Sequence, residues 1–115
     1  MNWAEFVELY IPEPKTIQVE ALTGSGGYGD VYAAPVDVGP CVVDDTTRRV
    51  VAQTQDAEGG EVVSGTTVAA PPDTVAPPGS RVTLPWSDRV TRVLATSYLD
   101  DHGLGLPEHL ELSLE

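Results

Sequence analysis

Apolar and polar residues alternate at the two-residue spacing of β-strands in separate segments of this chain. In Lys15–Leu22, apolar residues stand at positions 17, 19 and 21, with polar residues between them. In His109–Leu114, leucine stands at positions 110, 112 and 114. Such alternation directs one face of a strand to a core and the other to solvent. We predict that both segments are half-buried strands.

The middle of the chain carries two runs rich in β-branched residues, Glu61–Ala70 and Arg89–Tyr98. Between them lie a proline-rich bend (71–79) and a short third run, Arg81–Leu84. Proline has no backbone N–H to donate, so the bend cannot be a central strand. The pattern predicts a strand, a bend, a short strand, a turn and a long strand.

Cys41–Val43 and Arg48–Thr54 are predicted to form a hairpin through the polar turn 44–47. A second turn, 55–60, should lead into the strand Glu61–Ala70. The remaining connections are expected to be a glycine loop at 24–30, irregular chain at 30–40 and a loop at 100–107.

These segments amount to roughly six to seven strands, with no helix long enough to cross over a parallel sheet. We therefore predict an all-β fold, a small antiparallel β-barrel or sandwich with long loops. At 115 residues the chain should form one domain, with an N-terminal arm at 1–15 and the barrel at 16–115.

The arm carries Trp3, Phe6 and Tyr10 near helical spacing, behind a possible N-cap at Asn2. Prolines at positions 12 and 14 end any helix there. We expect a short helical turn or an extended arm, whose aromatic residues pack on the barrel or on a neighbouring molecule.

The chain is strongly acidic, with 18 acidic and 6 basic residues and a net charge of −12. This balance argues against binding through a phosphate backbone, which requires clustered Lys and Arg. The acidity serves either solubility or an acidic functional surface. A single cysteine excludes an internal disulfide, and no run reaches the ~18 apolar residues of a membrane helix. We expect a soluble protein made in the cytoplasm.

Motifs that could support chemistry lack the context they need. Gly24–Gly29 matches G-x-G-x-x-G, but the residues after it cannot supply the helix N-terminus that binds a pyrophosphate. His102 and His109 lie near acidic residues without a standard metal-ligand spacing. Cys41 is expected to be a buried small side chain. Aspartate pairs at 44–45 and 100–101 fall in predicted turns. We predict no enzymatic activity, no cofactor and no metal.

Several short motifs follow one another in a distinctive order. They are Tyr28-Gly29-Asp30, Pro35-Val36, Cys41-Val42-Val43-Asp44, Arg48-Arg49-Val50-Val51, Gly59-Gly60-Glu61-Val62-Val63-Ser64, Pro78-Gly79-Ser80-Arg81-Val82-Thr83-Leu84, Val90-Thr91-Arg92-Val93-Leu94 and Pro107-Glu108-His109-Leu110-Glu111-Leu112. This ordered set, from about Thr16 to Leu114, resembles the head-to-tail stopper (head-completion) proteins of long-tailed bacteriophages. The chain departs from that pattern at Pro85-Trp86.

The resemblance implies a virion protein of the head–tail neck, assembled in the host cytoplasm. Such a protein forms a ring below the portal or its adaptor, closes the DNA channel after packaging and provides the platform for the tail terminator or tail tube. Genomic double-stranded DNA would pass through its lumen without sequence-specific binding, and an acidic lining would let the duplex slide.

Closure of the channel requires a loop that reaches the ring axis, and two polar turns are candidates. Their residues are Asp44, Asp45, Gln53, Gln55, Asp56, Glu58, Gly59 and Gly60. A ring also requires two different contact surfaces on each subunit. Trp3, Phe6 and Tyr10 are the candidates for the subunit or adaptor interface. Simple hairpin turns, and packing of the arm on its own barrel, are the alternatives.

Two other functions remain open. One is another neck component, an adaptor or a tail-completion protein, although adaptors of this kind are usually helical. The other is a non-phage binding module of OB type, which would need a basic or aromatic strand face.

Overall fold

The structure, a computed structural model, describes residues 1–26, 29–45, 47–51, 53, 61–85 and 89–115. This part of the chain contains one short helix and ten strands. They are α1 (Trp3–Tyr10), β1 (Lys15–Glu20), β2 (Leu22–Gly26), β3 (Gly29–Tyr32), β4 (Val36–Asp44), β5 (Arg48–Val51), β6 (Glu61–Ser64), β7 (Thr66–Ala70), β8 (Arg81–Thr83), β9 (Val90–Leu99) and β10 (His109–Leu114).

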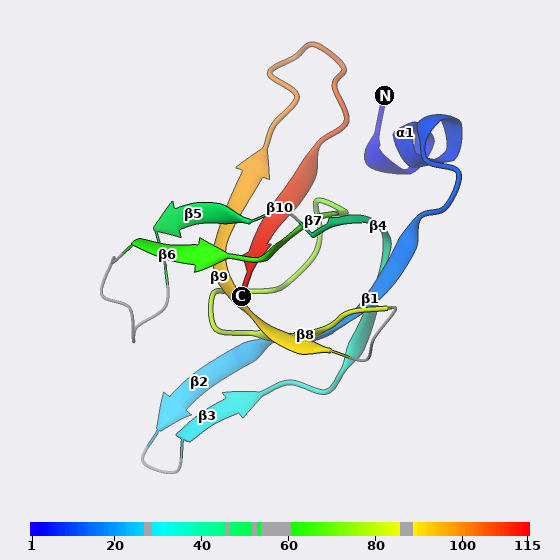
Figure 1. Cartoon of the computed structure of the whole chain (residues 1–115). Coiled ribbons are helices and arrows are strands. Elements are labelled where there is room, and N and C mark those ends of the chain that lie inside the picture. Colours follow the sequence, from blue (N-terminus) through cyan, green and yellow to red (C-terminus); the bar gives the residue numbers. More distant parts are fainter. Residues whose placement is uncertain (27–28, 46, 52, 54–60, 86–88) are drawn as a thin grey trace.

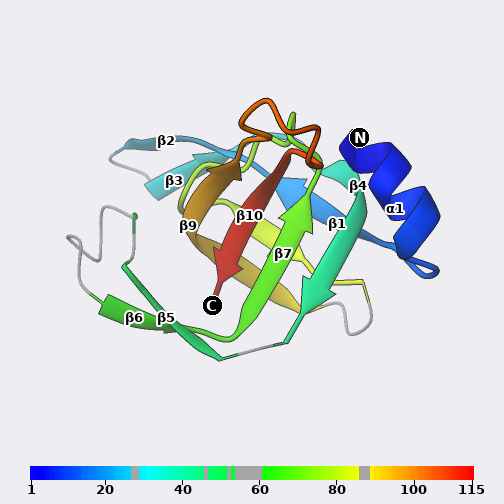
Figure 2. The ribbon, with the colours of Figure 1, turned by 90° about the horizontal axis from the view of Figure 1, so that it is seen from above.

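Six strands join edge to edge and close on themselves in the order β1-β4-β7-β10-β9-β8. Every neighbouring pair in this ring, including β8 with β1, is antiparallel. Two further hairpins, β2–β3 and β5–β6, stand away from the ring, and α1 lies beside it (Figures 1 and 2). The predicted all-β, antiparallel fold with a small barrel is confirmed.

Aliphatic side chains fill the interior of the ring. Leu112 and Leu114 from β10 are fully buried, and Ile17 and Val19 from β1 are 1% and 2% exposed. Val68, Val82 and Val93 complete the same cluster from β7, β8 and β9. The alternation predicted for Lys15–Leu22 and His109–Leu114 therefore matches the inward positions of β1 and β10.

The glycine loop predicted at 24–30 and the irregular segment at 30–40 are wrong. β2 and β3 pair from Leu22↔Tyr32 to Gly26↔Gly29, and β4 begins at Val36. The β2–β3 ribbon stands off the barrel and its side chains do not alternate between core and solvent, so its sequence shows no alternation of apolar residues. Gly29 lies at φ 100°, a conformation that glycine adopts at little cost.

The hairpin predicted between Cys41–Val43 and Arg48–Thr54 is also wrong. β4 pairs with β1 and β7, whereas β5 pairs with β6. The single strand predicted at Glu61–Ala70 is two strands separated at Gly65. β6 belongs to the hairpin outside the barrel, and β7 belongs to the barrel. Buried Ser64 fixes the chain at this point. Its hydroxyl hydrogen is shared between the carbonyl oxygens of Leu114 (2.6 Å) and Thr66 (3.1 Å).

The helical option for the N-terminal arm is correct. Asn2 caps α1, since its Oδ1 accepts a hydrogen bond from the backbone N–H of Glu5 at 2.8 Å. The helix ends at Tyr10, just before the first proline. The short strand at 81–83, the long strand at 90–99 and the loop at 100–107 lie close to where the sequence predicts them.

Leu112→Ala should lower the free energy of unfolding by about 2–5 kcal/mol, because it opens a cavity in the barrel core. Leu104→Ala is the matched control, since Leu104 is 75% exposed in the loop after β9 and should cost less than about 0.5 kcal/mol. Urea unfolding measures both values. Equal losses would contradict the position of Leu112 in the core.

Candidate functional site

The N-terminal helix is anchored to its own barrel by Trp3. Trp3 is 5% exposed, and its indole Nε1 donates to the carbonyl oxygen of Pro40 at 2.7 Å. Its ring lies 5.0 Å from the His109 ring, between centroids, and Val7 on the same helix is 3% exposed. Packing of the arm on its own barrel, one of the two alternatives left open by the sequence, therefore holds for Trp3.

The side of α1 that faces away from Trp3 and Val7 is exposed and mixed in character, because Glu5, Glu8 and Leu9 lie on it. Tyr10 is 61% exposed and Leu9 is 66% exposed. Phe6 lies half-buried between the rings of Trp3 and Tyr10, with centroid distances of 5.7 Å and 5.4 Å. Of the three predicted interface residues, Tyr10 and part of Phe6 remain available to a partner, and Leu9 joins them. Leu9 was not among the predicted interface residues, because that prediction rested on the aromatic residues of the arm.

The first candidate gating turn is tied to the barrel wall. Asp44 ends β4 and is exposed. Asp45 Oδ1 accepts a hydrogen bond from Thr66 Oγ1 at 2.8 Å, and the same hydroxyl accepts one from Arg89 Nη2 at 2.7 Å. Arg89 Nη2 lies 4.0 Å from Asp45 Oδ1. Asp45 thus links the chain leaving β4 to the strands beside it.

The second candidate gating turn begins at a residue bonded to β9. The backbone N–H of Gln53 donates to the Leu94 carbonyl oxygen at 2.7 Å, and Gln53 Oε1 accepts from the Thr96 N–H at 3.0 Å. Gln53 therefore anchors one base of the connection between β5 and β6. Gln55, Asp56, Glu58, Gly59 and Gly60 lie outside the described residues, so their gating role stays a prediction.

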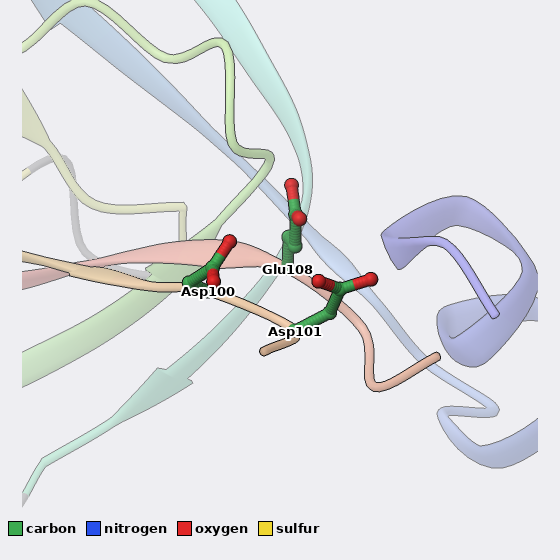
Figure 3. A group of neighbouring side chains, drawn as sticks. All are labelled: Asp100, Asp101 and Glu108. Carbon is green, nitrogen blue, oxygen red and sulfur yellow. The ribbon is translucent and has the colours of Figure 1, made fainter. Parts of the chain in front are cut away.

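Three carboxylates gather where β9 ends and β10 begins: Asp100, Asp101 and Glu108 (Figure 3). One carboxylate oxygen from each lies within 4.8 Å of the others, and Asp100 is exposed. Asp100 Oδ2 accepts the N–H of His102 (3.1 Å), Asp101 Oδ1 accepts the N–H of Gly103 (3.0 Å), and Glu108 Oε2 accepts the hydroxyl of Tyr98 (2.8 Å).

Oxygen ligands of this kind suit Ca²⁺ or Mg²⁺. These hydrogen bonds indicate a structural role for the three carboxylates, because they stabilise the loop between β9 and β10. His102 Nδ1 lies 3.7 Å from Asp100 Oδ2, whereas His109 stacks on Trp3 with its Nδ1 2.9 Å from the Pro107 carbonyl oxygen. The two histidines therefore belong to different surroundings.

The other residues considered for chemistry, Cys41 and the glycines Gly24 and Gly29, occupy structural positions. Cys41 is fully buried, and burial raises the pKa of its thiol to about 12. The thiol therefore stays protonated at neutral pH and is a weak nucleophile. Gly24 and Gly29 belong to the β2–β3 hairpin, and strand β3 stands where a dinucleotide-binding motif would need a helix.

No family model, no curated protein and no solved structure matches this chain. Among the described residues, no helix is long and apolar enough to cross a membrane.

Trp3→Ala should lower the free energy of unfolding by about 3–5 kcal/mol, and Trp3→Phe by about 1–3 kcal/mol, because Phe leaves the Pro40 carbonyl without its donor. Tyr10→Ala, at an exposed position of the same helix, should cost about 0.5 kcal/mol or less. Urea unfolding and amide hydrogen exchange in α1 measure the effect. A Trp3→Ala variant as stable as Tyr10→Ala would contradict the anchoring.

The hydrogen bond to Glu108 raises the pKa of Tyr98 above its ordinary value, with further contributions from desolvation and from the charges of Glu108, Asp100 and Asp101. Glu108→Gln should therefore lower the pKa of Tyr98. Tyrosinate absorbance followed against pH measures the change, and a Tyr98→Phe variant identifies which transition belongs to Tyr98. Glu8→Gln, on the exposed helix surface, is the control.

Since the folded-state pKa of Tyr98 is the higher one, its contribution to stability is complete below the ordinary tyrosine pKa and is lost as pH rises through the folded value. An unchanged Tyr98 transition in Glu108→Gln would contradict the contact.

Proposed function

We propose that this protein is a structural component of a phage neck, a head-to-tail stopper. It forms a ring below the portal or adaptor, closes the DNA channel after packaging and provides the surface on which the tail docks. The observation that carries the proposal is a closed six-stranded barrel from which the β5–β6 hairpin projects (Figure 2). The connection at the end of that hairpin includes the second candidate gating turn.

The charge of the chain supports passage of DNA without binding. Eighteen acidic residues against six basic ones give each subunit a charge of −12. A ring of such subunits repels the phosphate backbone, so a duplex in the lumen experiences no specific grip. The negative charge is consistent with a channel through which DNA passes. It counts against the OB-type module, which binds nucleic acid through basic and aromatic side chains.

The barrel also provides separate surfaces for different partners. The exposed surface of α1, where Leu9 and Tyr10 stand beside Glu5 and Glu8, is the surface proposed to contact the portal or adaptor. Asp45 and Gln53, at the starts of the two candidate gating turns, are bonded to the barrel, so the proposed gating role falls to the residues that follow them. The all-β fold favours a stopper over an adaptor, because adaptors of this kind are usually helical.

The test is a nonsense mutation of this gene in the phage that carries it, followed by electron microscopy of the lysate. We expect separate tails beside heads that packaged DNA and then lost it. The wild-type gene supplied from a plasmid should restore complete virions and serves as the control. Full heads that retain DNA but lack tails would indicate tail completion instead, and normal virions would overturn a neck role.

A further inference from the structure

The first half of β4 has a neighbouring strand on one side only. Residues 36–38 pair with β1, whereas β7 pairs with residues 42–44 in the second half of the strand. β7 ends at Ala70, and the chain then enters the bend 71–75. Within the described part of the chain, no backbone hydrogen bond joins this bend to residues 36–39. The side of β4 that faces the bend is therefore an open strand edge, whose backbone groups can pair with another strand.

A groove of about 440 Å³ with mostly apolar walls lies along this edge, between residues 36–39 of β4 and the bend. Val36 and Val38 line it and stand opposite Val19 and Ile17, which are buried in the core. Directly paired residues share a face of the sheet, so Val36 and Val38 point to the core side. Val36 is nevertheless 58% exposed. The groove thus leaves open an apolar surface that the next strand of a barrel would cover.

The outer rim of the same groove is negatively charged. Asp37 pairs with Gln18 and points to the outer face of the sheet, between the two inward valines. Asp73, in the bend, also lines the groove, and both carboxylates are exposed. The lining residues include no lysine, arginine or histidine. A strand that complements this edge therefore carries aliphatic side chains inward and a basic side chain outward between them.

The basic residues of this chain have other contacts, so a second copy does not supply that strand. Four arginines lie within 4.0 Å of a carboxylate of their own molecule: Arg48, Arg81, Arg89 and Arg92. Arg49 also has an interaction within the molecule, and Lys15 is half-buried in β1. Copies with a charge of −12 also repel one another. These contacts favour a different protein as the occupant.

We propose that the groove binds an extended segment of a different protein, which adds a strand along residues 36–39 of β4. Aliphatic side chains of that segment pack on Val36 and Val38, and a lysine or arginine between them faces Asp37 and Asp73. In strand addition, backbone hydrogen bonds supply affinity and alternate side chains supply specificity. The inference goes beyond the neck role and does not depend on it, because it uses only the open edge, the apolar wall and the two carboxylates.

Charge reversal in the full-length protein tests the side-chain part of the contact. The probes are fluorescent heptapeptides in which valine, isoleucine or leucine alternates with lysine or threonine, and fluorescence anisotropy measures their binding. Asp37→Lys and Asp73→Lys should each weaken binding of the lysine peptides roughly tenfold, since each replaces an attraction by a repulsion. Glu8→Lys makes the same change in net charge on the exposed surface of α1 and should leave binding unchanged. Circular dichroism and thermal unfolding establish that each variant is folded.

Peptide chemistry tests the backbone part on the wild-type protein. Methylation of one peptide nitrogen at a time should weaken binding at every second position, because only alternate N–H groups of an added strand face β4. Saturable binding with this two-residue period and with the loss at Asp37→Lys and Asp73→Lys supports the inference. No saturable binding by any peptide of the set, binding insensitive to methylation at every position, or an equal loss in Glu8→Lys overturns it.

Discussion

The structure depends on closure of the barrel through a very short strand. β8 has three residues, yet it bonds β1 on one side and β9 on the other. Without it, both neighbours would be open sheet edges. The turn before β8 places it: Gly79 lies at φ +94°, and a Cβ there would stand 2.8 Å from Leu22 Cδ2. The hydroxyl of Ser80 donates to the Pro77 carbonyl oxygen (2.6 Å) and accepts the Leu22 N–H (2.9 Å).

Closure of the barrel separates it from the elements that lie outside it. Because each barrel strand pairs with its two neighbours, α1 and the hairpins β2–β3 and β5–β6 add contacts outside the six-stranded sheet. α1 is held by one indole and a valine, which leaves its other face exposed. The β5–β6 hairpin is joined to the barrel at Gly65 and by Gln53. A closed barrel with separate projecting elements is consistent with the proposed neck role, in which the protein contacts several different neighbours.

The sequence predicted the elements whose side chains alternate between core and solvent. β1 and β10 follow that pattern, and the proline bend 71–79 correctly separates β7 from β8. The hairpins were missed or mispaired because neither is part of the barrel wall, so their side chains lack the regular alternation of a core-facing strand, and glycines in β2 hide its strand character. β6 and β7 are separated at Gly65. The preceding residue, Ser64, is buried and bonds Leu114, which lies 50 residues away. Such a long-range contact leaves no local pattern.

The candidate sites could be predicted only in part for the same reason. Aromatic spacing correctly indicated a helical arm but could not show that Trp3 faces the Pro40 carbonyl oxygen. The polar turns at 44–47 and 53–60 were predicted as candidate gating loops or simple hairpin turns, and no local pattern indicated that Asp45 and Gln53 bond to β7 and β9. The apolar groove was not foreseen, because its walls come together from β1, β4 and the bend.

The most direct test of the proposed neck role is a cryo-electron microscopy reconstruction of the neck of a long-tailed phage whose genome encodes this chain. We expect a ring of these six-stranded barrels between the portal or adaptor and the tail, with α1 facing one neighbour and the lumen free of strong DNA contacts. A neck ring built from another protein, with this chain absent from purified virions, would contradict the proposed function.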